Sequence, residues 1–204
     1  SFFHPEELDV KTKAWLRHYF EEQIYPVVTP LAVDSGHPFP FLANNTINAI
    51  VRIFQVQPDG TKDYKIAILP IPSVLDRIIE VPSSSNKEHR FVYLEDVISY
   101  YAIQFFQGYG IEEAMIFRLT RDADLEIDEE DAKDLLTEVE ASLRRRRRGD
   151  AVRLEVVGGG SPELLRTVLA SVELEEKDVY HIDGHLDCRM YFDFSNYPGY
   201  DNLR

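Results

Sequence analysis

Five consecutive arginines at positions 144–148 are the residues of this sequence best suited to chemistry. A guanidinium group is planar and always charged, and it binds phosphate oxygens through paired hydrogen bonds. Successive residues of a helix point about 100° apart, however, so the five side chains cannot all face one anion. The candidate contacts for phosphate or for a second subunit are Arg121, Arg144, Arg146 and Arg147.

The arginine run also has a purely structural explanation. Carboxylates dominate from Asp122 to Glu140, directly before the arginines. If Asp128 caps a helix over about 129–147, the carboxylates lie at its positive N-terminus and the guanidinium groups at its negative C-terminus. That arrangement stabilises a helix without any ligand, and we favour it over a binding role.

The histidines and the single cysteine give weaker signals. His181 and His185 are four residues apart, which suits a metal site on a helix, but Asp183-Gly184 between them predicts a turn. Cys188 stands alone, so an internal disulfide and a cysteine metal cluster are excluded. We therefore predict no metal site and no catalytic residue in this chain.

Two further patterns are compatible with a small-molecule enzyme. An unrelated enzyme could use Asp122, Asp124 and His37, since two carboxylates two residues apart can hold a metal, although on a strand end such side chains point to opposite sides. The glycines at 158–160 precede a helix, as phosphate-binding loops do, but no Gly-Lys-Ser/Thr follows them. We interpret both patterns as loop features and rank this enzyme class last.

Hydrophobic periodicity predicts the elements that position these residues. Helices are expected over about 9–23, 95–107 and 129–147, and Ser161-Pro162 begins a fourth that ends near Ser171. The predicted strands cover 46–56, 64–69, 78–81, 90–93, 114–120, 151–157 and 179–182. Because hairpins and helical crossovers coexist, we predict an α+β fold with a mixed, partly antiparallel sheet and flanking helices, bordering on α/β.

Composition and charge narrow the possible functions. The 204 residues are 44% hydrophobic, which is enough for the core of one domain over 1–204. The formal net charge of −14 repels nucleic acid, so we expect no nucleic-acid partner. No apolar run approaches the roughly 20 residues of a membrane span, and the N-terminus lacks a secretory signal, so we expect a cytoplasmic protein.

Several segments resemble the middle of class 1 polyphosphate kinases. They are residues 31–34, 37–42, 120–130, the arginine run, residues 149–156, Val179-Tyr180 and Asp183-Gly184. Each is weak alone, but in this order they are specific. The similar blocks spread from about Pro26 to Asn202, which is nearly the whole chain.

The resemblance implies a four-part enzyme. A small helical domain, linked through a helix within residues 1–25, would precede this head domain, and two domains of phospholipase D type would follow it. The whole enzyme would use ATP and Mg²⁺ to extend polyphosphate reversibly, through a histidine phosphorylated in the C-terminal half. The head would help to form a homodimer and border the active-site tunnel. None of the six histidines here lies in a matching segment, so we expect the isolated chain to be inactive.

Two alternatives stay open at this point. The acidic charge and the aromatic first helix are compatible with a free-standing acidic protein-interaction domain. The small-molecule enzyme based on His37, Asp122 and Asp124 is the other alternative. The coding sequence beyond Arg204 would separate these classes, because only the head domain requires several hundred further residues.

Overall fold

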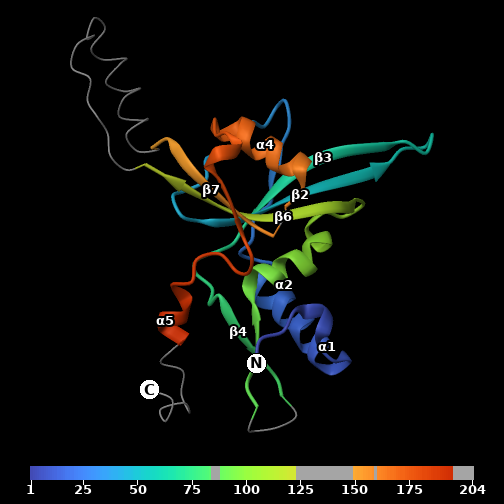
Figure 1. The fold of residues 1–204 in the computed structure, drawn as a ribbon. Helices are drawn as coiled ribbons and strands as arrows, with labels where there is room; N and C mark the ends of the chain where they lie inside the picture. Colours follow the sequence, from blue (N-terminus) through green and yellow to red (C-terminus); the bar gives the residue numbers. More distant parts are fainter. Residues whose placement is uncertain (84–87, 123–148, 159, 195–204) are drawn as a thin grey trace, which may run out of the picture.

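A computed structural model describes residues 1–83, 88–122, 149–158 and 160–194 (Figure 1). A six-stranded sheet has one helix on its upper face in this view, and the other helices and a small hairpin lie below it. The helix predicted over 129–147 falls outside the described residues.

The main sheet has the strand order β1-β3-β2-β6-β7-β8. Its strands are β1 Leu31–Val33, β2 Ile47–Val56, β3 Lys62–Pro70, β6 Gly110–Arg121, β7 Ala151–Val157 and β8 Val179–Ile182. All neighbouring strands are antiparallel except β7 and β8, which are parallel. The mixed sheet with its helices confirms the predicted α+β class.

The predicted hairpin forms between β2 and β3. Alternation in β2 sends Ala49 and Val51 to one face and Ile50 to the other, and all three are fully buried. The turn closes where the amide of Gln57 donates to the carbonyl of Thr61 at 2.8 Å and Gly60 adopts φ +84°. The far end of the hairpin projects beyond the sheet as a two-stranded arm (Figure 1).

A second hairpin lies below the sheet and contains the two short strands predicted over 78–81 and 90–93. It consists of β4 Ile78–Val81 and β5 Arg90–Tyr93, which are antiparallel. The N-terminal residues extend it, because the amide of Phe3 donates to the carbonyl of Phe91 and the amide of Phe91 donates to the carbonyl of Ser1, both at 2.9 Å. This pairing by residues 1–3 was not predicted from the sequence.

The first two helices lie in the lower part of the molecule. Helix α1 spans Val10–Tyr19, is capped by Asp9 through the Thr12 amide at 3.0 Å, and continues as a π-helical turn over Phe20–Ile24. It confirms the helix predicted over 9–23. The helix predicted over 95–107 was too long. Helix α2 spans only Leu94–Tyr100, and a 3₁₀ turn follows over Ala102–Phe105.

The remaining elements are one longer helix and three short helical segments. Helix α4 spans Pro162–Val172, and the amide of Leu164 donates to the capping hydroxyl of Ser161 at 3.2 Å, as the Ser-Pro pair predicts. Two 3₁₀ turns, η1 at Pro5–Glu7 and η4 at Glu176–Asp178, and a final helix, α5 at Met190–Phe194, complete the fold.

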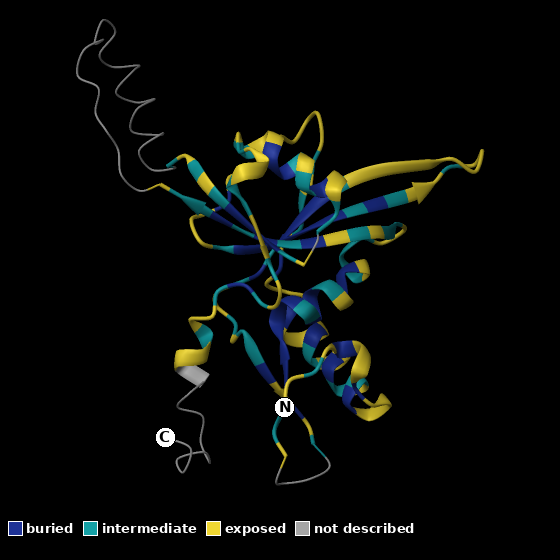
Figure 2. Cartoon of the chain, viewed as in Figure 1, coloured by how far each residue is buried: buried dark blue, intermediate teal, exposed yellow. Residues whose placement is uncertain are grey.

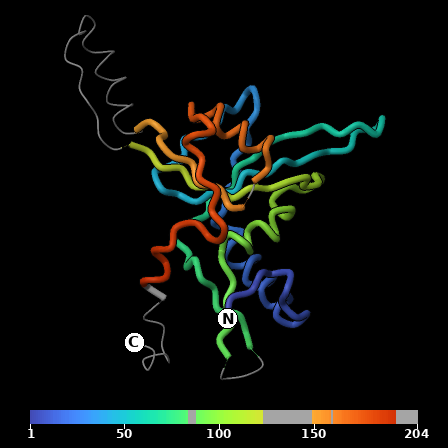
Figure 3. Tube along the Cα trace, in the orientation of Figure 1, coloured from blue at the N-terminus to red at the C-terminus, as the bar shows by residue number. Residues whose placement is uncertain are grey.

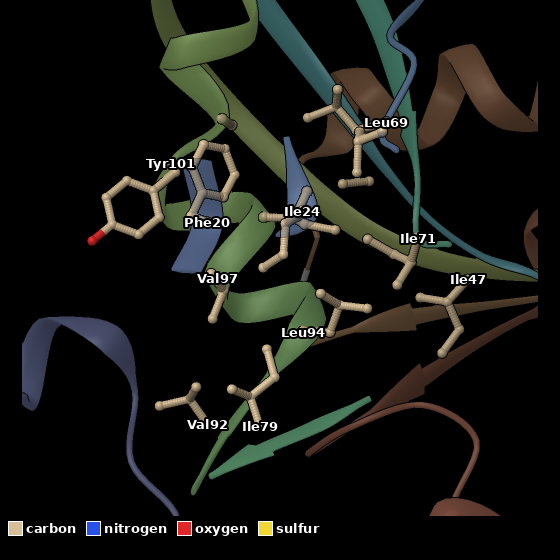
Figure 4. Packing of buried hydrophobic residues seen from close by; sticks show 14 of the residues in the cluster. Phe20, Ile24, Ile47, Leu69, Ile71, Ile79, Val92, Leu94, Val97 and Tyr101 are labelled. Atoms are coloured by element: carbon tan, nitrogen blue, oxygen red, sulfur yellow. The ribbon is translucent and has the colours of Figure 1, made fainter. Parts of the chain in front are cut away.

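Two hydrophobic cores lie on opposite faces of the sheet. The upper core packs α4 against the sheet, with Ile50, Phe117 and Leu164 fully buried in it. The lower core packs α1, α2 and the second hairpin against the other face, and Phe20, Val97 and Leu69 belong to it (Figure 4). Burial follows these two layers, whereas the hairpin arm is largely exposed (Figure 2).

Candidate functional site

The last described segment, residues 183–194, runs from β8 down to α5 in the lower part of the molecule (Figures 1 and 3). We call it the strap. Its residue Leu186 is 2% exposed and belongs to the lower core. A loop residue buried to this extent indicates that side chains elsewhere in the chain contact the strap. We take the residues that make these contacts as the candidate site.

One half of the sheet presents polar side chains toward the strap. In β6 and β7 the residues facing α4 are apolar, so their alternating neighbours face the opposite side. The strand register sets Arg118 opposite Glu155 and Thr120 opposite Arg153. We call this surface the polar face, and its side chains are Arg118, Thr120, Arg153, Glu155 and Tyr180.

Five charged side chains on this face and the strap alternate in sign. The Glu155 carboxylate, 7% exposed, accepts a hydrogen bond from Arg118 at 2.5 Å and forms an ion pair with Arg153 at 2.8 Å. Arg118 reaches Asp187 of the strap at 3.4 Å, and Arg189 binds Asp187 at 2.6 Å. Hydrogen bonds from Arg189 lower the pKa of the Asp187 carboxyl to about 2. This ionic ladder ties β7, β6 and the strap together.

A cavity of about 430 Å³ opens between the polar face and the strap. Its charged lining residues are members of the ionic ladder, and His185 and Cys188 of the strap also line it. Each guanidinium in it already has a carboxylate partner, so the cavity is not a ready-made site for a polyanion. The charged residues that line the cavity therefore serve to hold the strap in place.

A second clamp holds the strap from the other side. Arg77, just before β4, binds the buried carboxylate of Glu95 in α2. The same guanidinium donates to the carbonyl oxygen of Asp187 at 2.8 Å and to that of Leu186. One side chain therefore joins α2 to the backbone of the strap.

The structure describes only one of the four arginines predicted as contacts. Arg121 ends β6, where its side chain donates to the carbonyls of Leu42 and Gly149, each at 2.9 Å. Its guanidinium also lies 4.5 Å from the centre of the Phe41 ring. These contacts support a structural role for Arg121, whereas Arg144, Arg146 and Arg147 lie outside the described residues.

The other sequence candidates have local roles. His37 is exposed and its ring contacts Asp34 at 3.0 Å, which helps to lower the pKa of that carboxyl. The amide of Asp122 donates to Asp150 at 2.8 Å, and Asp124 is outside the described residues. No group of three or more histidine, cysteine, aspartate or glutamate side chains suited to a metal ion occurs in the described part of the chain.

The two paired histidines and the glycine loop also separate in space. His181 contacts the carbonyl of Gly158 at 3.0 Å, whereas His185 contacts Asp96 at 3.1 Å. The amide of Gly158 donates to Ile182, so this end of the glycine loop serves the contact between β7 and β8. Cys188 is an exposed free thiol.

Sequence reasoning missed the ionic ladder and the Arg77 clamp. One signal was present: Arg118 and Glu155 are charged residues inside strands whose neighbours are apolar. A charge at such a position usually has a buried partner. Its identity was not readable, because Arg118 and Glu155 are 37 residues apart and Arg77 and Asp187 are 110 apart.

Comparison with known proteins identifies the class of domain to which this fold belongs. Residues 11–194 match the family described as the polyphosphate kinase middle domain. The chain belongs to the polyphosphate kinase family and corresponds to its middle domain. None of the helices in the described part of the chain combines the length and hydrophobicity of a membrane-spanning segment.

Curated relatives agree with this assignment. A polyphosphate kinase of Halalkalibacterium halodurans is 41% identical over 192 residues, which are 94% of this chain and 27% of that protein. One of Pseudomonas syringae pv. tomato is 37% identical over 195 residues, 95% of this chain and 26% of that protein. The chain thus spans about a quarter of the length of these relatives.

A solved structure shows the same fold. The crystal structure of the polyphosphate kinase from Porphyromonas gingivalis superposes with a TM-score of 0.66 and covers 87% of this chain and 24% of that one. Sequence identity is 22%, so this likeness supports the architecture.

Proposed function

We propose that this chain is the head domain of a class 1 polyphosphate kinase, which transfers the terminal phosphate of ATP reversibly to polyphosphate. The observation that carries the proposal is the family match over residues 11–194 in a chain that spans 27% of a relative's length. A domain with this share of an enzyme acts together with the remaining domains. The alternative of a free-standing acidic interaction domain is not favoured by this match.

In this proposal the head has no catalytic residue of its own. The arginines of the polar face are paired with Glu155 and Asp187, which suits a role in holding the strap. With a net charge of −14, the domain would repel a polyphosphate chain over most of its surface. ATP, Mg²⁺ and the positive lining of the tunnel would therefore come from the other domains.

The finer features are proposed on the same basis. The head borders the active-site tunnel and contributes to a homodimer in the cytoplasm. Residues 1–204 act as one domain, and the segment 1–25, which contains α1, links it to a preceding helical domain. Arg144, Arg146 and Arg147 are proposed contacts for phosphate or the partner subunit, although a structural role is favoured.

The test compares this chain with the longer enzyme that contains it. Both are incubated with γ-labelled ATP and Mg²⁺, and labelled protein and acid-insoluble polymer are measured. We expect polymer and phosphorylated protein from the longer enzyme and neither from the 204-residue chain. Polymer made by the isolated chain would contradict the proposed division of labour, and a longer enzyme without activity would contradict the proposed reaction.

A further inference from the structure

Two aspartate–glycine pairs occur in the sequence, and one of them begins the strap. Asp183-Gly184 directly follows β8, whereas Asp59-Gly60 lies in the turn between β2 and β3. All four residues are exposed. An aspartate before a glycine can isomerise without an enzyme, because glycine has no side chain to shield its amide nitrogen from the neighbouring carboxyl carbon. The two pairs therefore carry the same reactive groups in different surroundings.

Hydrogen bonds hold both reactive groups of the Asp59-Gly60 pair. The amide of Gly60 donates to the carbonyl of Gln57 at 2.9 Å. The Asp59 carboxylate accepts from the amide and from the hydroxyl of Thr61, at 2.9 and 2.6 Å. These bonds from Thr61 lower the pKa of Asp59 and so favour the ionised form, which cyclises poorly. Isomerisation of this pair must first break hydrogen bonds on both sides.

The Asp183-Gly184 pair is not held in this way. In the part of the chain that the structure describes, the Asp183 carboxylate forms no hydrogen bond or ion pair, and the Gly184 amide donates to no acceptor. The space around Gly184 is also open, since a Cβ there would meet nothing within 4 Å. The amide nitrogen and the carboxyl carbon can therefore approach each other without the loss of a hydrogen bond.

We propose that Asp183-Gly184 is a site of spontaneous aspartate isomerisation at the start of the strap. The amide nitrogen of Gly184 bonds to Cγ of Asp183, and one carboxyl oxygen leaves as water with the carboxyl proton and the amide proton. Water then reopens the cyclic imide at one of its two carbonyl carbons. Cleavage of the bond between nitrogen and Cγ restores aspartate. Cleavage at the original main-chain carbonyl gives isoaspartate, whose main chain runs through Cβ and Cγ.

Isoaspartate would lengthen the main chain by one atom directly before the contacts that hold the strap. His185 stacks on the Tyr93 ring with 3.5 Å between centroids. Leu186 is buried in the lower core, and Arg77 donates to the carbonyl of Asp187 at 2.8 Å. The partners of all three strap residues belong to other elements, so an extra main-chain atom shifts the strap away from them. The isomerised chain therefore holds the strap less firmly.

Ageing of the native chain tests the proposal. The 204-residue chain is kept at neutral pH, and isoaspartate at each pair is measured over time by enzymatic methylation and by electron-transfer fragmentation of its peptides. We expect isoaspartate to accumulate at least about fivefold faster at Asp183 than at Asp59, since one hydrogen bond that must open slows the reaction by roughly that factor. Equal rates, or no isoaspartate at Asp183, would overturn the proposal.

Two controls separate the effect of the fold from that of the local sequence. In concentrated urea the hydrogen bonds of the turn are lost, so both pairs should isomerise at similar rates. Thr61→Ala removes the hydroxyl that binds Asp59, and it should speed isomerisation there by about two- to tenfold while leaving Asp183 unchanged. If the preference for Asp183 persists in urea, the fold does not select the site and the structural assignment is refuted.

The effect on the strap is measured with a variant that keeps the charge. Asp183→Glu carries a longer side chain that would have to close a larger ring, so it should not isomerise at this pair. After ageing, the unaltered chain should contain a fraction that unfolds at lower urea concentration, whereas Asp183→Glu should not. An equal loss of stability in both chains, or no loss in the isomerised fraction, would contradict the proposed loosening of the strap.

Discussion

The carboxylate of Glu95, 1% exposed, accepts two hydrogen bonds from the guanidinium of Arg77, at 2.5 and 3.1 Å. The same guanidinium holds the backbone carbonyls of Leu186 and Asp187. The Arg77 side chain thus donates to the Glu95 carboxylate and to both of these backbone carbonyls. The pair thus links the stability of α2 to the docking of the strap.

Glu95→Gln should therefore destabilise the chain by about 3–5 kcal/mol, because it leaves a largely buried guanidinium without its counter-ion. Urea unfolding measures this change. The matched control is Glu21→Gln, which removes the exposed pair of Glu21 with Arg17 (2.9 Å) and should cost at most about 0.5 kcal/mol. Equal costs for the two variants would show that burial of the Arg77 pair has no energetic weight.

Gly149→Ala tests the close approach between the ends of β6 and β7. Gly149 has φ +57°, and a Cβ there would lie 1.9 Å from the carbonyl oxygen of Asp122, whose amide is bonded to Asp150. We expect a loss of about 3 kcal/mol, seen as a lower melting temperature.

Gly60→Ala is the control for that substitution. Gly60 also has positive φ, but its Cβ would meet nothing within 4 Å. It should cost only the conformational strain, about 1 kcal/mol. If Gly149→Ala and Gly60→Ala lower the melting temperature equally, the steric contact at Gly149 does not affect stability.

Acid sensitivity should report the ionic ladder. The pKa of Asp187 is about 2 in the folded chain against an ordinary 3.8, so its charge stabilises the fold above about pH 4 and this contribution fades as pH falls toward 2. Between about pH 5 and 2.5, Asp187→Asn should lose about 1–2 kcal/mol less stability than the unaltered chain. The control variant Asp63→Asn, on the exposed hairpin arm, should lose as much stability between these pH values as the unaltered chain. Urea midpoints at the two pH values decide between these outcomes.

The arginine run remains a sequence-based prediction. If these residues only complement a helix end, Arg146→Gln/Arg147→Gln should cost about 0.3–1 kcal/mol per charge, and the cost should fade with salt. Polyphosphate affinity and sedimentation of the longer enzyme should then stay near normal. A stable variant with about ten- to a hundredfold weaker polymer binding, or without dimers, would favour the binding role.

Elements fixed by local sequence were predictable. The β2–β3 hairpin followed from alternation on either side of Pro58-Asp59-Gly60, and α4 from Ser161-Pro162. Strand β6 begins at Gly110 and not near Ala114, because pairing with β2 recruits polar residues that carry no strand pattern. Tertiary pairing therefore overrode local preference there.

The candidate site was largely beyond sequence reasoning. His185 was considered with His181, four residues away, but its partner is Asp96, 89 residues away. A turn at Asp183-Gly184 was predicted, and the chain bends at these two residues, which separates the histidines. What no local pattern could supply was the chain topology that brings α2 and the strap together.

The main sheet separates the two hydrophobic cores, and its strands contribute side chains to both of them. In β2, Ile50 faces α4 whereas Val51 faces the lower helices; in β3, Ile68 and Leu69 divide in the same way. Adjacent residues of the same strand belong to different cores. One core therefore cannot unfold while the sheet that supports the other core stays native. Heating should therefore unfold both layers in one cooperative step, with equal calorimetric and van't Hoff enthalpies.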